Sequence, residues 1–351
     1  MDIQNHIYTY QDAMDGIQVP NAPSGFDCLS KDRLKAFLSN PNLSDTNMPM
    51  LVYTTVDGNV AGWMMLFPTK LILDGEPCEA MSASDFHVLK EYQHMALGVD
   101  LVVFPVVEEG NKYLLYAGPS PMALKLYKKL KFNIFSMPYI ERKQRYSLNR
   151  KKGLRTKGHN IVVSVANLGL ELAHDVDCLV SRAKGFDVRK LDEVPEWVEV
   201  MIKNDGRRFS EAHDRKWLQW SLENRYHGEP ENKQALWGIY KNDKPCGFAL
   251  TTERLRLGKV FGFVAEWGSG DDKLTEELVY RMIIPTFSKK VEKIGLALND
   301  VRIVESFKKL GFRRENDFII VFRDLIHKIE GIQDAKNWRL RYGYADVILS
   351  S

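Results

Sequence analysis

A short sequence motif occurs twice, about half the chain apart. The heptapeptide LYKKLKF at 126–132 returns as SFKKLGF at 306–312 in a chain of 351 residues. A second pair supports the repeat, because DGNVAGW at 57–63 has a counterpart in NDKPCGF at 242–248, in the same order before its heptapeptide. Self-similarity over such an interval predicts one folding unit that is used twice.

The length of the chain agrees with two domains. With 351 residues, each half is long enough to bury a hydrophobic core of its own. We therefore expect an N-terminal domain over 1–145 and a C-terminal domain over 146–351. Where they meet, the segment 142–158 contains eight basic residues and no acidic one. Such a segment is typical of a solvated linker, or of a site that attracts phosphate groups.

Cysteine usage and charge argue against several classes of protein. Cys28, Cys78, Cys178 and Cys246 are far apart and lack CxxC spacing, so we expect neither a metal site nor a disulfide framework. The N-terminus is polar and acidic, unlike a signal peptide, and the longest apolar stretch, 161–173, is short for a bilayer span. The formal net charge of +3 does not favour nucleic acid. The sequence predicts a cytoplasmic protein without membrane insertion, compatible with a homodimer.

The first half begins with a ladder of strands. Residues 51–56, 60–73 and about 78–88 are separated by Asp-Gly turns, so we expect consecutive antiparallel strands joined by hairpins. A polar loop at 89–98 then leads into an apolar helical segment, which Pro105 would end or kink.

The remaining elements of this half complete a mixed α/β pattern. Residues 112–118 predict another strand, and Ser120 and Pro121 are suited to be the N-cap and first residue of the helix PMALKLYKKL. The segment 132–146 reads as strand, turn and strand. Together these elements predict a mixed α/β sheet whose 89–98 loop faces a helix N-terminus.

The loop and the later helix each contain a recognisable motif. Residues 88–98 read VLKEYQHMALG, and residues 120–132 read SPMALKLYKKLKF. They resemble two motifs of the GNAT N-acyltransferase superfamily, the loop (Q/R)-x-x-G-x-(G/A) and the helix N-x-x-A-x-x-L-Y-x-K-L-G-F. Gln93 and Gly98 match the loop, whereas Ala96 stands where the family usually has glycine. The resemblance implies two GNAT-like units, each a mostly antiparallel central sheet flanked by helices.

The resemblance also implies an acyl-coenzyme A cofactor, most simply acetyl-CoA. Backbone N–H groups at a helix N-terminus have no helical partners and point together at an anion, here the pyrophosphate. Alanine at position 96 would be strained if the loop needed a positive φ there. The residues expected to hold the cofactor are Val88, Gln93, His94, Met95, Ala96, Leu97 and Gly98.

Carried over from the family, the catalytic groups belong to the same region. Backbone near Val88 would donate to the oxyanion, and Tyr127 would protonate the departing thiolate. In the second copy, Phe307 stands at the position of Tyr127. Asp85 and His87 are candidates for the base, because regular alternation places them on one face of their strand. A purely structural role for this pair, and simple packing of Tyr127, stay open.

The second copy departs from the loop motif. After the expected strand at 260–267, the chain reads GSGDDK, with Asp271 and Asp272 where an anion-binding loop needs neutral or basic groups. Two carboxylates would repel a pyrophosphate. We therefore expect coenzyme A to bind only the N-terminal unit and the second unit to be a scaffold or acceptor platform. A phosphate cradle at 268–270 is the alternative.

A further likeness concerns the acceptor. The segment HDRKWLQWSL, which begins at His213, and NWRLRYGYAD at 337–346 are similar to patterns of a tandem GNAT group linked to surface-polysaccharide biosynthesis. Asp214, Trp217 and Trp220 fit one helix face and are candidates for binding a sugar. Core tryptophans beside a solvated aspartate are the alternative.

These observations predict an N-acetyltransferase that transfers acetyl from acetyl-CoA to an amine of a small molecule, such as an amino-sugar precursor. Two alternatives stay open. One is a non-catalytic binding protein that retains the fold. The other is an aminoacyl transferase resembling the peptidoglycan-bridge enzymes, for which tRNA would be a partner; otherwise no nucleic acid is expected.

Overall fold

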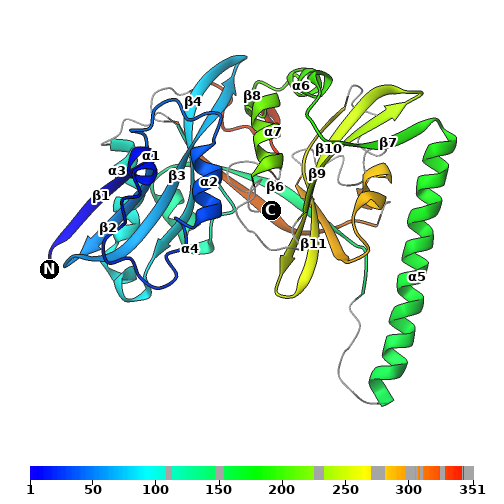
Figure 1. The fold of residues 1–351 in the computed structure, drawn as a ribbon, viewed down its shortest axis with the longest axis horizontal. Coiled ribbons are helices and arrows are strands. Elements are labelled where there is room, and N and C mark those ends of the chain that lie inside the picture. The colour runs from blue at the N-terminus through cyan, green and yellow to red at the C-terminus, as the bar shows by residue number, and fades with distance from the viewer. Residues whose placement is uncertain are drawn as a thin grey trace.

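The computed structural model describes residues 1–107, 113–146, 154–224, 233–269, 281–297, 305, 307–308, 311–324, 329–341 and 343. Two sets of elements follow one another along the chain (Figure 1). The first half contains β1 (Ile3–Thr9), α1 (Tyr10–Met14), α2 (Lys31–Leu38), β2 (Pro49–Val56), β3 (Asn59–Leu73), β4 (Glu76–Val88), η1 (Lys90–Met95), α3 (Leu97–Val107), β5 (Tyr113–Ala117), α4 (Pro121–Lys129) and β6 (Asn133–Lys143). The second half contains α5 (Leu154–Ala183), β7 (Phe186–Leu191), α6 (Glu196–Lys203), β8 (Phe209–Glu211), α7 (Arg215–Glu223), β9 (Lys233–Lys241), β10 (Lys244–Arg256), β11 (Lys259–Ser269), η2 (Ile284–Thr286), β12 (Val291–Ala297), β13 (Arg313–Asp324), η3 (Ala335–Asn337) and β14 (Trp338–Arg339).

The strands form one continuous sheet in which the two halves exchange their last long strands. The order is β1-β2-β3-β4-β5-β13-β6-β12-β11-β10-β9-β7, with β8 beside β3 and β14 beside β8. Strand β13 of the second half pairs antiparallel with β5, and β6 of the first half pairs antiparallel with β12. The predicted mixed α/β fold of two similar units is confirmed. The domain boundary at 145 stays a prediction, and the sheet crosses it.

Turn chemistry explains the hairpins. The turn between β2 and β3 has positive φ at both central residues, 49° at Asp57 and 79° at Gly58, and the turn between β3 and β4 repeats this at Asp74 and Gly75. Such type I′ turns match the twist of paired strands and favour Asp-Gly. The counterpart turn between β9 and β10 also has positive φ at Asn242. The predicted hairpins of the first half are confirmed.

Where the structure describes both copies of the heptapeptide, they share the same backbone hydrogen bond and turn. The amide of its last phenylalanine donates to the carbonyl oxygen of the aromatic residue five positions earlier, at 3.0 Å in the first copy and 3.1 Å in the second. The residue between has positive φ in both, 58° at Lys131 and 83° at Gly311. Tyr127 and Phe307, at equivalent positions, are both buried. The repeat inferred from the sequence is therefore a structural repeat.

The sheet of the first half has a hydrophobic core on each face. Met65 and Phe67 of β3 pack in the cluster that includes α1, α2 and α7, whereas Met64 and Leu66 pack on the other side with α3 and α4. This alternation is the two-residue period of a strand that is buried on both faces.

Two local predictions need correction. The segment expected to form strand, turn and strand is the single strand β6, because β13 and β12 flank it on either side and bond along its length. Pro105 does not end α3, which continues to Val107. The N-cap prediction is confirmed, since the Ser120 hydroxyl accepts from the amide of Ala123 at 3.2 Å.

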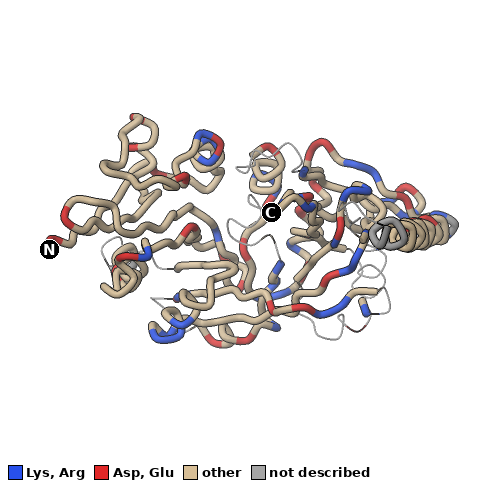
Figure 2. Tube along the Cα trace, turned by 90° about the horizontal axis from the view of Figure 1, so that it is seen from below, with Lys and Arg blue, Asp and Glu red and all other residues tan. Residues whose placement is uncertain are grey.

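Helix α5, with 30 residues, stands at the outer edge of the second half beside β7 (Figure 1). It accounts for part of the basic segment 142–158, whose first residues belong to β6; residues 147–153 lie outside the described ranges. Among the described helices, none is both long and apolar enough to cross a membrane. Along the described trace, basic and acidic residues are interspersed in both halves (Figure 2).

Candidate functional site

The candidate site lies where two parallel strands diverge. Strand β4 pairs with β5 only over Met81–Ala83, although β4 continues to Val88. A cavity of about 600 Å³ lies at this free end, between the last residues of β4, the start of α3 and one face of α4. This volume falls within the usual range for small-molecule sites.

The backbone of the loop after β4 meets the condition under which alanine at position 96 was expected to be strained. Ala96 adopts a left-handed conformation, with φ of 57°, so the position does need a positive φ and the alanine is strained. Gly98 follows at the start of α3, and a Cβ there would lie 3.1 Å from the Phe86 ring. Gln93 donates to the carbonyl oxygen of Val88 at 3.2 Å, which ties the loop to the strand.

Four of the seven residues predicted to hold the cofactor line the cavity. They are Val88, Gln93, Ala96 and Gly98. The other three point elsewhere, because the short helix η1 turns the chain between them. His94 is exposed to solvent, and Met95 and Leu97 pack in the cluster around Val56. For these three side chains the structure gives no contact with the cavity.

Two cationic residues of the cavity were not predicted from the sequence. Lys125 and Lys129 both line it from α4, and both are exposed. Residues four apart lie on one face of a helix, so this spacing within PMALKLYKKL was the available signal. The lysines, together with the N-terminus of α3, suit anionic groups, and Phe86, Val88 and Leu126 supply apolar surface. The lining therefore fits an elongated ligand with phosphates and an apolar arm, such as an acyl-coenzyme A.

A β-bulge separates the two residues that were predicted as candidates for the catalytic base, Asp85 and His87. The register between β3 and β4 shifts beside Asp85, whose φ is 49°, so regular alternation does not hold there. Asp85 forms an ion pair with Arg33 of α2, at 2.5 Å between Oδ2 and Nη1. His87 lines the cavity and packs on Trp63 with ring centroids 4.7 Å apart. Of the two, only His87 contacts the cavity.

Tyr127 lies behind the cavity wall. Its side chain is only 1% exposed and packs on Tyr116 with ring centroids 4.6 Å apart. Burial raises the pKa of Tyr127, and the neighbouring Tyr116 hydroxyl, with which it shares a hydrogen bond, raises that pKa further. The hydroxyl therefore stays protonated near neutral pH, and its raised pKa makes it a weaker proton donor than an exposed tyrosine. That it protonates the departing thiolate stays a prediction.

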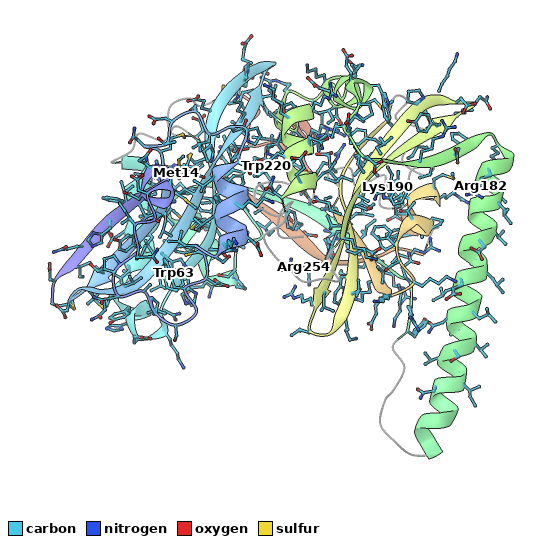
Figure 3. The ribbon with its side chains drawn as sticks, in the orientation of Figure 1. Met14, Trp63, Arg182, Lys190, Trp220 and Arg254 are labelled. Atoms are coloured by element: carbon cyan, nitrogen blue, oxygen red, sulfur yellow. The ribbon has the colours of Figure 1, made fainter. Side chains whose placement is uncertain are left out.

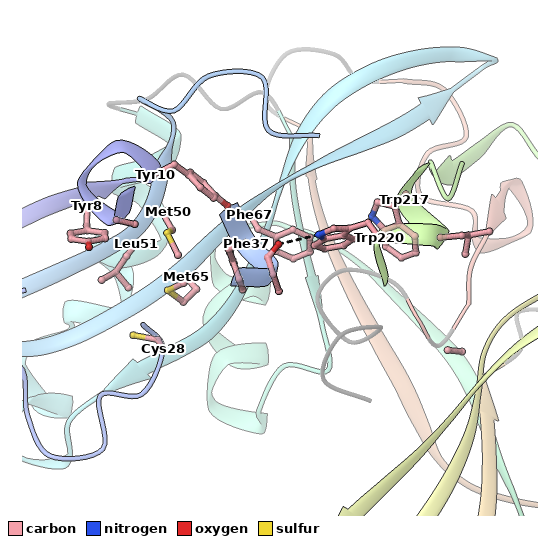
Figure 4. Packing of buried hydrophobic residues seen from close by; sticks show 14 of the residues in the cluster. Tyr8, Tyr10, Cys28, Phe37, Met50, Leu51, Met65, Phe67, Trp217 and Trp220 are labelled. Atoms are coloured by element: carbon pink, nitrogen blue, oxygen red, sulfur yellow. Dashed lines mark hydrogen bonds between the residues drawn. The ribbon is translucent and has the colours of Figure 1, made fainter. Parts of the chain in front are cut away.

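The three residues predicted to bind the acceptor have structural roles. The Asp214 carboxylate caps α7 by accepting from the amide of Trp217 at 2.8 Å. Trp217 is fully buried, and Trp220 donates to the carbonyl oxygen of Ala36 at 3.0 Å (Figure 4). Trp220 lies where the two halves meet (Figure 3). These contacts match the alternative of core tryptophans, except that the aspartate is a helix cap.

A second polar region is completely buried where the halves meet. His213 lies between two carboxylates, 3.0 Å from Glu211 and also bonded to Glu266, and its ring stacks on Trp217 at 3.8 Å. Arg339 donates to Glu266 at 2.5 Å. Burial alone would lower the pKa of His213, but hydrogen bonds to the two carboxylates outweigh it and the pKa is raised. We call Glu211, His213, Glu266 and Arg339 the ionic cluster.

The second copy has the same strand divergence. Strand β11 pairs parallel with β12 only over its first residues, as far as Phe263, and continues to Ser269. A Cβ on Gly268 would lie 2.6 Å from the Phe248 ring, so strand packing explains that glycine. Asp271 and Asp272, and residue 270 of the proposed phosphate cradle, lie outside the described residues.

Comparison with known proteins gives a fold but no sequence family. No protein-family model matches the chain, and no curated protein matches it. A GCN5-related N-acetyltransferase from Anabaena variabilis is similar with TM-score 0.57 and 9% identity, over 92% of this chain and 73% of that one. Saccharomyces cerevisiae N-myristoyltransferase with bound myristoyl-CoA has TM-score 0.54 and 11% identity, over 93% and 83%. A putative acetyltransferase from Pyrococcus horikoshii has TM-score 0.50 and 14% identity, over 99% and 95%.

These likenesses cover more than nine tenths of the chain, and therefore both halves. At such low identity they establish the fold alone. The protein has the fold of the GNAT N-acyltransferases.

Proposed function

We propose that the protein is an acyl-CoA-dependent N-acyltransferase that acts on an amine of a small molecule. The observation that carries this proposal is the cavity at the splayed end of β4, lined by Gly98 and by Lys125 and Lys129. The cavity lies beside the loop 88–98. In the GNAT superfamily, which this loop resembles, the cofactor binds beside the corresponding loop. The acyl group is most simply acetyl, and amino-sugar precursors are the first acceptors to test.

The residues that line the cavity, and Tyr127 buried behind its wall, divide into binding and proton-handling groups. Lys125 and Lys129, with the N-terminus of α3, would hold the phosphates, and the apolar wall at Val88 would hold the pantetheine arm. When bound, an acyl-CoA supplies a thioester carbonyl for an amine to attack. The His87 imidazole, at the cavity edge, would accept a proton from the amine. The Tyr127 hydroxyl would donate a proton to the departing thiolate.

Calorimetric titration with acetyl-CoA tests the binding half of the proposal. We expect one saturable site per chain and a rise in melting temperature with ligand concentration, because a ligand that binds only the folded state stabilises it. Lys129→Glu should weaken binding at least tenfold, which is about 1.4 kcal/mol. Lys128→Glu is the matched control, because Lys128 is exposed on the same helix but does not line the cavity. Equal losses in both variants, or two sites per chain, would contradict the assignment.

The chemical half needs an acceptor. Amino sugars and nucleotide amino sugars can be screened with acetyl-CoA and with myristoyl-CoA for release of free thiol. Turnover with an amine acceptor is the expected result. Saturable acetyl-CoA binding without turnover on any amine would instead favour a non-catalytic binding protein that retains the fold. The strained Ala96 and the buried Tyr127 agree with that alternative.

A further inference from the structure

Helix α5 presents a long apolar stripe to solvent. Eight of its aliphatic side chains are between 45% and 67% exposed. These are Ile161, Val162, Val165, Leu168, Leu172, Val176, Leu179 and Val180. The helix stands at the edge of the molecule, with many of its side chains projecting away from the sheet (Figure 3). Monomeric proteins rarely expose a continuous apolar surface of this extent.

The stripe lies on the face opposite the protein body. On the inner face, Val163 is 6% exposed and Asn167 is 9% exposed. Asn167 is anchored to the end of the first half, because it accepts from the amide of Tyr146 at 2.8 Å and donates to the carbonyl oxygen of Tyr146 at 3.2 Å. At about 100° per residue, positions 161, 165, 168, 172, 176 and 179 fall together on the opposite face. The exposed stripe is therefore separate from the surface that holds α5 in place.

We propose that this stripe is the interface of a homodimer in which two α5 helices pack antiparallel. The intervals of three and four residues along the stripe are those of helices that pack side by side. A standard interface takes about 800 Å² from each partner, and these eight side chains, each 45–67% exposed, form a continuous apolar surface for such an interface. The sequence alone was only compatible with a homodimer, and the structure supplies the surface.

Two pairs of stripe residues exchange places when the direction of the helix is reversed about position 170. Leu168 and Leu172 lie on either side of the centre of the stripe, and Ile161 and Leu179 lie near its ends. A twofold interface requires this property, since each residue i that contacts j must also serve as j for the partner. Gly169 lies near the centre, and a Cβ there would meet nothing within 4 Å. The missing side chain leaves room for two helix backbones to approach.

Charge favours the antiparallel direction and disfavours a lipid surface. Glu171 and Asp175 lie in the second half of α5. A parallel pair would bring the acidic residues of the two helices together, and an antiparallel pair separates them. Helix dipoles also favour the antiparallel arrangement. Asp175, exposed beside the stripe, would be repelled by anionic headgroups, whereas Glu171 pairs with Lys289 at 3.3 Å.

The oligomeric state of the full chain tests the proposal. Light scattering coupled to size exclusion should give twice the chain mass of 40.4 kDa. Leu168→Glu should give a monomer that retains its circular dichroism, because Leu168 is exposed within one chain. Leu257→Glu is the matched control and should remain a dimer, since Leu257 is 94% exposed in the turn between β10 and β11. A monomeric wild-type chain, or a dimer that survives Leu168→Glu, would overturn the proposal.

Two further measurements address direction and the lipid alternative. In a Cys178→Ser background, oxidation of a mixture of Ile161→Cys and Leu179→Cys chains should join one to the other, whereas Ile161→Cys alone should not cross-link. Efficient cross-linking of Ile161→Cys alone would show parallel helices and refute the antiparallel arrangement. Co-sedimentation of a monomeric wild-type chain with phosphatidylserine vesicles, abolished by Leu168→Glu, would assign the stripe to a membrane surface instead.

Discussion

The cavity at the end of β4 and the ionic cluster between the halves are both polar, but they are built in opposite ways. In the cluster, His213, Glu211 and Glu266 have no exposed surface and each contacts an opposite charge. The cavity is open, its lysines are exposed, and Ala96 holds a strained backbone. Shifted pKa values often mark active sites, yet here a buried, charge-paired histidine belongs to a structural junction. The candidate site is recognised instead by its backbone, which diverges from β5 at the end of β4 and is strained at Ala96.

The cluster joins elements from the two halves of the chain. Glu211 of β8 accepts from the Thr69 hydroxyl of β3 at 2.7 Å, and Glu266 belongs to β11. Arg339 reaches Glu266 from β14, close to the C-terminus. Charges in this position contribute to how the halves are held, whereas the charges around the cavity are free to meet a ligand.

Removal of the central histidine should have the largest effect, and it should fall on stability. His213→Gln removes the cation that Glu211 and Glu266 share, although Glu266 still pairs with Arg339, and breaking a buried ion pair costs roughly 3–5 kcal/mol. Urea unfolding measures the loss. Arg208→Gln is the control, because Arg208 pairs with Asp74 on the surface at 2.6 Å, and such pairs contribute about 1 kcal/mol or less. If His213→Gln costs no more than Arg208→Gln, the cluster does not hold the halves together.

The same histidine predicts a pH dependence. Its pKa is raised in the folded protein, so its stabilising contribution is complete below the ordinary histidine pKa of about 6.5. It is lost as the pH rises through the raised value. The difference in unfolding free energy between wild type and His213→Gln should therefore shrink toward alkaline pH. A difference that grows with pH would show that His213 is neutral in the cluster.

At the cavity, the largest effect should fall on rate. If Tyr127 donates the proton, Tyr127→Phe should lower turnover by about 10²-fold or more, with acetyl-CoA affinity nearly intact. Phenylalanine retains the packing, and Phe307 occupies the equivalent buried position in the second copy. Tyr116→Phe is the control, because Tyr116 of β5 shares the hydrogen bond with Tyr127 but is not the proposed proton donor. Wild-type turnover of Tyr127→Phe, with chemistry limiting, would reduce Tyr127 to a core residue.

The next effect should fall on affinity. Gly98→Glu adds bulk and a negative charge beside the cavity, so acetyl-CoA should bind at least tenfold more weakly, by about 1.4 kcal/mol or more. Gly98→Ala is the graded control, because its methyl would meet the Phe86 ring at 3.1 Å and other side chains only at ordinary contact distances of 3.7 Å or more, and a ring edge can shift. Calorimetry reports both values. Unchanged affinity in a folded Gly98→Glu variant would show that phosphates bind elsewhere.

Local features were predictable from the sequence, and long-range ones were not. The Asp-Gly turns and the Ser120 cap have short-range causes, so the hairpins and α4 were predicted correctly. The exchange of β6 and β13 depends on partners more than a hundred residues away, and no local pattern encodes it. The bulge at Asp85 likewise arises from pairing with β3 and separates Asp85 from His87. The apolar stripe of α5 was visible as residues, but its exposure was not.

The smallest effect should come from Ala96, and it should have the opposite sign. A left-handed alanine costs about 1 kcal/mol relative to glycine, so Ala96→Gly relieves strain, although glycine also makes the unfolded chain more flexible. The net gain in unfolding free energy should lie between zero and about 1 kcal/mol, with tighter acetyl-CoA binding because the loop loses a methyl group from the cavity lining. Lys131→Gly is the matched control, since Lys131 has nearly the same φ, 58° against 57°, and its counterpart in the second copy is already glycine.

Both variants should gain similar stability, but only Ala96→Gly should alter affinity, because Lys131 does not line the cavity. Urea unfolding and calorimetry on the two variants give the comparison. Equal changes in acetyl-CoA affinity in the two variants would mean that affinity follows the stability of the whole fold and not the loop at Ala96. Weaker binding in Ala96→Gly would mean that the methyl group of Ala96 contacts the ligand, so that the strained conformation is retained for binding.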